Sequence, residues 1–331
     1  MDNNKVYEER AKSEHFSVAA DIAEKLVNEV EKAVVGKRYE ITLLICAMLS
    51  GSHVLIEDVP GVGKTTLASA LAKAAGLSFK RAQFTPDVMA SDITGFNIYN
   101  RQNETFEFRE GLVACNMLLA DEINRASPKT QSSLLEAMEE FKVTVDGVTY
   151  ELPKPFMVIA TQNPSGFVGT YPLPEAQLDR FALKISMGYP SQEEEVNIIS
   201  DRMKVNPLQN ISAITDVATI ESMRNVVMNI KMDREICKYI VSLVSSTRSH
   251  PSLLLGASPR ASLALMHLSK AWAFMQGRDF VIPEDVRALF KQSLVHRIIL
   301  NQEARLGQST AESILAEIIA HTPVPYKGTR E

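Results

Sequence analysis

The sequence predicts an α/β protein with a parallel β-sheet, followed by a helical domain. Three observations support this prediction. Five short apolar or β-branched runs alternate with helical or turn-rich stretches, which is typical of a parallel sheet with helices on both faces. Two further segments alternate polar and apolar residues around a turn signal, as β-hairpins do. After residue 190, apolar residues recur almost entirely at helical spacing.

The N-terminal part is predicted to be a polar tail followed by two helices. Residues 1–16 are mostly polar, and we expect a tail there. From Ser17 to about Ser50 apolar residues recur at helical spacing, with a break at Val35-Gly36-Lys37. This break predicts a turn between the two helices.

The predicted strands and hairpins follow in order along the chain. Two hairpins are expected to be insertions, because residues 97–111 and 142–153 do not fit a plain α/β repeat. The five strands are expected at residues 53–57, 79–84, 116–121, 156–161 and 181–187.

A domain boundary is predicted near residue 190. A chain of 331 residues is long enough for two domains. We therefore expect an α/β core over residues 17–190 and a helical domain over residues 191–331, in which Pro283 starts one helix.

Composition indicates a soluble, cytoplasmic protein. The net charge of −5 gives no electrostatic reason to expect wholesale nucleic-acid or membrane binding and leaves a local basic channel open. Three widely separated cysteines suit reduced thiols better than disulfides.

The N-terminus lacks an apolar signal core, and the longest apolar run, residues 41–49, is too short to span a bilayer. No zinc motif is present among the scattered histidines, so any metal is expected to arrive with a ligand.

Residues 56–66, IEDVPGVGKTT, nearly match the phosphate-binding loop pattern, with Asp58 in place of the first glycine. A strand, a turn and a helix starting at Lys64 would direct backbone N–H groups at a polyphosphate. Lys64 would contact the β- and γ-phosphates, and Thr65 would hold Mg²⁺. Gly61 and Gly63 lie where side chains would collide with the ligand. Asp58 lies at the entry of the loop, so the missing glycine need not abolish binding. The alternative is a chance match in a turn.

An acidic pair ends the strand predicted at residues 116–121. Asp121 and Glu122 would lie at the carboxyl edge of the sheet, where ligands bind in open α/β sheets. Asp121 would hold Mg²⁺ through water, and Glu122 would polarise the attacking water. The alternative is a strand end that two acids keep solvated.

Three further polar residues are candidates for catalysis. Asn163 follows the strand at residues 156–161 and would orient the attacking water, unless it is an ordinary turn asparagine. Arg180 precedes the last strand and Arg260 begins a helix of the second domain. Each arginine could reach a phosphate, and each could equally be an ordinary surface charge.

Taken in order, DVPGVGKTT, LLADEINRA, ATQNP, LDRF and GASPRA resemble the Walker A, Walker B, sensor 1, arginine-finger and sensor 2 elements of AAA+ ATPases. Residues 81–95, 121–140 and 171–181 are more narrowly similar to the MoxR family. The resemblance covers nearly the whole chain from Ser17, and Asp58 is a familiar variant in that family.

The resemblance implies a five-stranded AAA+ core with inserted β-hairpins, a helical lid, and a homo-oligomeric ring, usually a hexamer, with ATP and Mg²⁺ between subunits. Arg180 would then act in trans and Arg260 in cis. The implied nucleotide-binding residues are Val35, Gly36, Asp58, Val59, Pro60, Gly61, Val62, Gly63, Lys64, Thr65 and Thr66.

MoxR proteins are regarded as chaperone-like, so the resemblance implies an ATPase that remodels or matures partner proteins or inserts their metal cofactors. Such partners often carry a von Willebrand factor A domain. Two other classes stay open. The helix-2-insert AAA+ group includes nucleic-acid motors and magnesium-chelatase-like motor subunits, although the predicted hairpin at 97–111 is not basic. A nucleotide-gated scaffold without turnover is disfavoured by Glu122 and Arg180.

Overall fold

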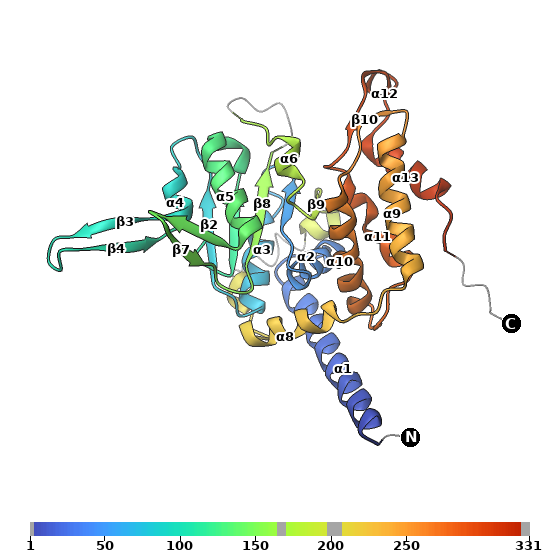
Figure 1. The fold of residues 1–331 in the computed structure, drawn as a ribbon, viewed down its shortest axis with the longest axis horizontal. Helices are drawn as coiled ribbons and strands as arrows, with labels where there is room; N and C mark the ends of the chain where they lie inside the picture. The colour runs from blue at the N-terminus through green and yellow to red at the C-terminus, as the bar shows by residue number, and fades with distance from the viewer. Residues whose placement is uncertain (1–2, 164–169, 197–206, 326–331) are drawn as a thin grey trace.

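The core is a five-stranded parallel sheet in the order β2-β5-β8-β1-β9 (Figure 1). The computed structural model describes residues 3–163, 170–196 and 207–325, with side chains from Phe16 onward. All five predicted strands are confirmed, with bounds close to those expected: β1 (Val54–Glu57), β2 (Phe79–Gln83), β5 (Met117–Asp121), β8 (Met157–Gln162) and β9 (Leu183–Ile185).

Alternate residues of the strands face two separate hydrophobic clusters, because successive side chains of a strand point to opposite faces. On β5, Met117 and Leu119 belong to one cluster, while Leu118 and Ala120 belong to the other. Both faces of the sheet are therefore buried, which explains why these strands are continuous apolar runs.

The first face is covered by α1 (Asn3–Glu31), α2 (Arg38–Leu49) and α3 (Lys64–Ala74), whose buried residues share a cluster with the lid helices. The predicted polar tail over residues 1–16 is helical where the structure describes it, because α1 already begins at Asn3 and projects from the body (Figure 1). Residues 3–15 contain many helix-forming Glu, Lys, Arg and Ala residues but no apolar stripe. Apolar periodicity therefore detected only the packed part of the helix.

The second face is covered by α5 (Pro128–Glu140), together with the short α4 (Ala90–Thr94) and the turn η1 (Ile123–Arg125). Both predicted hairpins are confirmed. The first, β3 (Gly95–Asn100) and β4 (Thr105–Glu110), extends far from the body in Figure 1. The second consists of β6 (Lys142–Val145) and β7 (Val148–Glu151).

After α6 (Glu175–Leu178) and β9, the chain enters the helical lid. The predicted boundary near residue 190 lies between β9 and the helical residues 192–196. In the part of the lid that the structure describes, one small antiparallel sheet, β10 (Leu253–Leu255) with β11 (Ile299–Leu300), lies among helices. After residues 192–196, these helices are η2 (Pro207–Asn210), α8 (Val217–Met228), α9 (Arg234–Ser249), α10 (Pro259–Met275), α11 (Pro283–Leu294), α12 (Gln302–Leu306) and α13 (Ala311–His321).

Among the helices that the structure describes, none combines the length and the apolar character needed to cross a bilayer. The three cysteines are free thiols, and Cys46 and Cys115 are buried.

Candidate nucleotide-binding site

The phosphate-binding loop has the geometry that the sequence predicts. Gly61 and Gly63 have φ angles of +90° and +92°, a region that favours glycine. Gly63 caps α3, which begins at Lys64, so the first free N–H groups of the helix face the loop. An anion placed there would meet backbone donors and the positive end of the helix dipole.

Lys64 is buried beneath this loop, with 8% of its surface exposed, and its Nζ donates to the backbone oxygen of Asp58 at 2.7 Å. Burial lowers the pKa of Lys64, while the carboxylates of Asp58, Asp121 and Glu122 oppose that shift. The ammonium group therefore lies among acids at the point where the loop would place a phosphate.

The acidic pair lies at the carboxyl end of β5. Asp121 accepts a hydrogen bond from Thr161 Oγ1 at 2.6 Å and forms an ion pair with Arg81 at 2.8 Å. These two contacts fix both carboxylate oxygens of Asp121.

Glu122 has a φ of +55°, an uncommon value outside glycine, and functional sites are enriched in such residues. Its Oε1 accepts from Asn163 Nδ2 at 3.2 Å, and its Oε2 lies 3.1 Å from Arg125 Nη1 without a well-aligned hydrogen bond. Glu122 and Asn163, which are both expected to act on the attacking water, are thus hydrogen-bonded to each other.

A cavity of about 320 Å³, which we call the phosphate cavity, brings these residues together. It is lined by Pro60, Gly61, Gly63, Lys64, Thr65, Thr66, Arg81, Gln83, Asp121, Glu122 and Asn163. A hydroxyl from Thr65 and a carboxylate from Asp121 are hard oxygen donors, which Mg²⁺ prefers together with phosphate oxygens and water. The donor set therefore fits a magnesium–polyphosphate complex.

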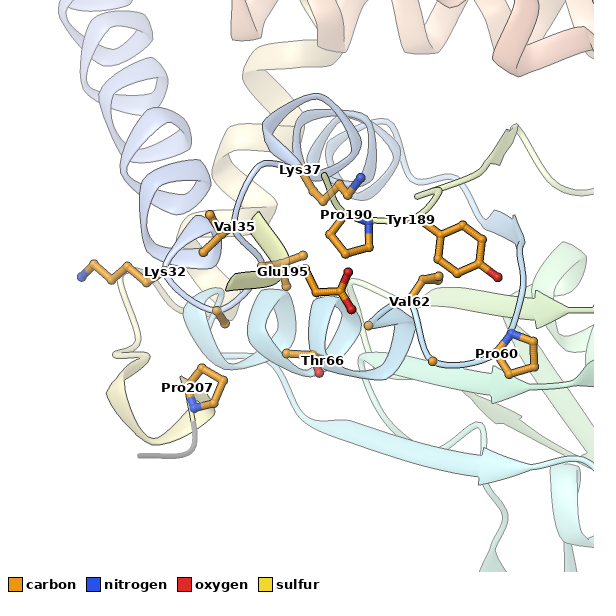
Figure 2. Close-up of a pocket in the computed structure, with 14 residues that line it drawn as sticks. Lys32, Val35, Lys37, Pro60, Val62, Thr66, Tyr189, Pro190, Glu195 and Pro207 are labelled. Atoms are coloured by element: carbon orange, nitrogen blue, oxygen red, sulfur yellow. The ribbon is translucent and has the colours of Figure 1, made fainter. Parts of the chain in front are cut away.

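A second cavity of about 310 Å³ lies on the other side of the loop and shares Pro60, Gly61, Gly63 and Thr66 with the first. In Figure 2, Val35, Val62, Tyr189 and Pro190 surround it, and the Glu195 carboxylate points inward. Gly36 takes a φ of +76°, in the turn between α1 and α2. This mostly apolar cavity is suited to a planar base, and it includes Val35 of the predicted adenine contact.

Asp58 is more than a tolerated substitution in the loop. It is 7% exposed, and its carboxylate accepts four hydrogen bonds. The donors are Val59 N, at 2.9 Å, and Ser186 Oγ, Met187 N and Gly188 N, at 3.0, 2.6 and 2.8 Å. The residue that breaks the glycine pattern therefore bonds the phosphate loop to the segment that leads from β9 into the lid.

The two predicted arginines lie at the opposite edge of the sheet. Arg180 precedes β9, and the residues that line the phosphate cavity follow β1, β5 and β8, so the length of a strand, about 13 Å, separates the two edges. Glu139 forms ion pairs with both Arg180, at 3.0 Å, and Arg260. A cavity of about 210 Å³, which shares no lining residue with the phosphate cavity, is lined by Arg180, Arg260 and Arg297.

The expected cis role of Arg260 does not fit this arrangement. The lid helix α10 places Arg260 beside Arg180 and not at the phosphate loop of its own chain. Sequence order alone could not show this, because the position of the lid depends on tertiary packing.

Several site residues were missed by the sequence analysis. Arg81 and Gln83 alternate with buried residues on β2, and Thr161 ends an apolar run, so each resembled an ordinary strand residue. Their only signal was proximity to the carboxyl ends of neighbouring strands. Glu139 and Arg297 gave no motif signal at all.

Comparison of the sequence with known protein families agrees with a nucleotide-binding core followed by a lid. Residues 53–183 match the family model described as ATPase family associated with various cellular activities (AAA), and residues 245–318 match the AAA lid domain. A core with this loop, acidic pair and lid defines the chain as an AAA+ ATPase, which binds nucleotide.

Individual relatives narrow the assignment. The chain is 50% identical to the uncharacterized protein YeaC of Bacillus subtilis, covering 92% of this chain and 95% of the relative. It is 39% identical to Chaperone MoxR1 of Mycobacterium tuberculosis, over 95% of this chain and 85% of that one. A crystal structure of a Cytophaga hutchinsonii protein, 38% identical, superposes with a TM-score of 0.90 over 96% of this chain and 99% of that one. The chain belongs to the MoxR family of AAA+ ATPases.

Proposed function

We propose that this protein hydrolyses ATP with Mg²⁺ in an oligomeric ring and uses the energy to remodel a client protein. The observation that carries the proposal is the joint placement of Lys64, Asp121, Glu122 and Asn163 around one cavity beside the phosphate loop. A scaffold that only bound nucleotide would not require the Glu122–Asn163 pair.

In this mechanism, the loop N–H groups and Lys64 bind the β- and γ-phosphates. Thr65 and Asp121 would hold Mg²⁺, which supplies charge neutralisation on the phosphates when bound. Asn163 orients the attacking water, and Glu122 accepts its proton. The adenine base occupies the cavity beside Val35, Gly36 and Val62.

The same mechanism requires a neighbouring subunit. Arg180 and Arg260 lie together at the amino edge of the sheet, partly exposed, where each can reach a γ-phosphate bound by the next subunit. A ring, with a hexamer as the expected size, would place the amino edge of one subunit against the carboxyl edge of the next. Arg180 then acts in trans as a finger, and Arg260 acts beside it in trans.

The exposed hairpin β3–β4 is the proposed client contact. Tyr99 and Phe106 pack together at 5.3 Å between ring centroids, yet they are 50% and 72% exposed. Apolar surface on a projecting hairpin suits a protein partner better than a nucleic acid. The client is expected to be matured, remodelled or loaded with a metal cofactor, and a von Willebrand factor A domain is the expected partner type.

This hairpin also separates the proposal from a nucleic-acid motor. Its two arginines, Arg101 and Arg109, are outnumbered by Glu104, Glu107 and Glu110. A motor related to magnesium chelatase would share the ATPase site and differ in its partner. Salt-dependent binding of duplex DNA by the purified protein would favour the nucleic-acid alternative.

Two variants test the proposed function. Lys64→Ala should lose ATP binding, whereas Glu122→Gln should bind ATP but turn it over about 10²-fold more slowly or worse. The Glu122→Gln protein in ATP should retain the client during affinity capture, and Lys64→Ala is the matched control. Near-normal turnover by Glu122→Gln would remove Glu122 from its assigned role.

A further inference from the structure

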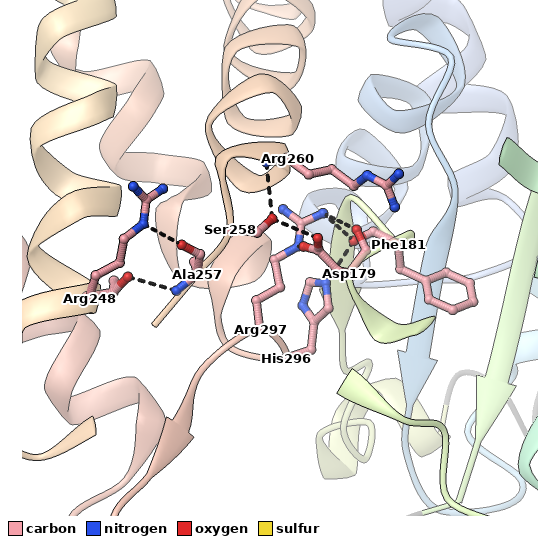
Figure 3. Close-up of polar contacts among 9 residues, drawn as sticks. Asp179, Phe181, Arg248, Ala257, Ser258, Arg260, His296 and Arg297 are labelled. Atoms are coloured by element: carbon pink, nitrogen blue, oxygen red, sulfur yellow. Dashed lines mark hydrogen bonds and ion pairs between the residues drawn. The ribbon is translucent and has the colours of Figure 1, made fainter. Parts of the chain in front are cut away.

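The turn that carries Arg180 is bonded to the lid by a buried arginine. Arg297 Nη2 donates to the backbone oxygens of Asp179 and Phe181, each at 2.9 Å, and thus to the residues on either side of Arg180 (Figure 3). Arg297 Nε lies 3.0 Å from Asp179 Oδ1, an ion pair whose alignment falls short of a hydrogen bond. Arg297 of the lid and one turn of the core therefore share a single polar cluster.

Further lid groups complete this cluster. His296 Nε2 lies 2.8 Å from the backbone oxygen of Phe181, and Ser258 Oγ donates to Asp179 Oδ2 at 2.7 Å. Ser258 also caps α10 by accepting from the backbone N–H of Arg260 at 3.1 Å. The cluster thereby fixes the backbone of Arg180 and the backbone of Arg260 with respect to each other.

The charge of Arg297 is costly to bury. Its side chain is 2% exposed, and burial lowers its pKa to about 10, with Asp179 opposing the shift, so the group stays protonated at neutral pH. Buried ion pairs are often no more stabilising than an apolar contact of the same size. The Arg297–Asp179 pair is therefore better explained by a role in positioning the backbone than by its contribution to the free energy of unfolding alone.

We propose that Arg297 is a positioning residue that holds the turn of residues 179–181 against the lid, so that Arg180 and Arg260 are presented together to the nucleotide of the neighbouring subunit. This inference rests on the proposed action of Arg180 in trans. Because Asp58 bonds the phosphate loop to residues 186–188, a lid movement that follows nucleotide binding would also move the turn that carries Arg180. Occupancy of one site would then affect catalysis at the next.

The test replaces Arg297 by lysine, which keeps the charge but loses the planar group that reaches both carbonyls. Arg297→Lys should keep ATP binding and lose turnover by about 10²-fold, because small displacements of a catalytic group are costly. In an Arg180→Ala background the same change should cause a smaller further loss, because the part of its effect that acts through Arg180 is already gone and only the part through Arg260 remains.

Arg278→Lys is the matched control. Arg278 also pairs with a buried aspartate, Asp285, but the pair lies wholly within the lid. This variant should lower the melting temperature and leave turnover per folded protein unchanged. If Arg297→Lys fails to fold, Asp179→Asn tests the same pair from the core side with the same expected pattern.

Hydrogen exchange reports on the turn directly, so it distinguishes an error in the role of Arg297 from an error in the proposed trans action of Arg180. Arg297→Lys should accelerate exchange in the peptide spanning residues 177–183. If Arg180→Ala retains turnover, the finger assignment is wrong, and the exchange result still decides whether Arg297 holds the turn. Unchanged exchange, or an equal loss of turnover with and without Arg180, would overturn the inference.

Discussion

At the carboxyl edge of the central sheet, one cavity contains Lys64 and Arg81 with two carboxylates, whereas at the amino edge another contains three arginines with Glu139 and Asp179. The first edge has the phosphate loop, the acidic pair and the amide of Asn163. The second has no phosphate loop but has more positive charge. Each edge lacks what the other has, which supports the proposal that a complete catalytic site forms between two subunits.

The two edges also differ in how they are fixed. Contacts at the carboxyl edge come mainly from the core itself, as in the Thr161–Asp121 and Asn163–Glu122 hydrogen bonds. Contacts at the amino edge come from the lid, through Ser258, His296 and Arg297. The lid position should therefore affect the amino edge more than the chemistry of the carboxyl edge.

The largest expected effect is that of Arg180→Ala. Loss of a trans arginine should lower ATP turnover by about 10³-fold in the assembled ring while ATP binding persists. Steady-state turnover and equilibrium nucleotide binding measure the two quantities.

Mixing subunits controls this experiment. At equal amounts, random rings of Arg180→Ala and Glu122→Gln subunits should recover about a quarter of wild-type turnover, because one interface in four joins an intact Arg180 to an intact Glu122. No recovery in mixed rings would contradict the shared site.

A smaller effect is expected for Asp58→Gly, which restores the usual glycine of the loop. The variant loses hydrogen bonds between the carboxylate and the residues 186–188, at a cost of about 2–3 kcal/mol in the free energy of unfolding. ATP binding should weaken roughly tenfold, because the loop is no longer fixed to the lid connection.

Chemical denaturation and nucleotide titration measure both effects of Asp58→Gly. Asp216→Gly removes a single exposed cap at the start of α8 and serves as the control. Unchanged affinity and turnover in Asp58→Gly would show that Asp58 has no influence on the site.

The smallest expected effect is the pH dependence of stability that comes from His53, a buried residue at the amino edge of the sheet. His53 Nδ1 accepts from Val158 N at 3.0 Å, and burial lowers the pKa of His53 to about 4. The folded protein protonates His53 less readily than the unfolded chain does. The stability that neutral His53 contributes is therefore present above about pH 6.5 and is lost progressively as the pH falls toward 4. At pH 5 the loss should be about 2 kcal/mol.

Comparison of the wild type with His53→Gln isolates this contribution from that of the carboxylates. The variant should lose less stability between pH 7 and pH 5, as measured by denaturant unfolding. His321→Gln, at the exposed end of α13, should behave as the wild type. A parallel pH dependence of His53→Gln and wild type would remove His53 as the cause.

Much of the core could be predicted from the sequence because its signals are local. Apolar runs mark the buried strands, and Asp121, Glu122 and Asn163 follow strands whose carboxyl ends meet at one edge. The phosphate loop was predictable because its conformation depends on glycines within a few residues of Lys64. The start of α1 was not predicted, since a helix without an apolar stripe leaves no periodic signal.

The sequence by itself determined the parallel sheet, the two hairpins, and most of the residues that surround the phosphate cavity, with Arg81 and Gln83 as exceptions. Only the tertiary structure decided that Asp58 bonds the phosphate loop to the lid connection, that Arg260 lies beside Arg180, and that Arg297 donates to the turn that carries Arg180. The physical reason is sequence separation: residues 58 and 187 become neighbours only when the sheet assembles, and 139 with 260, and 181 with 297, only when the lid packs on the core. No local pattern records such contacts, because their free energy depends on burial that distant segments create together.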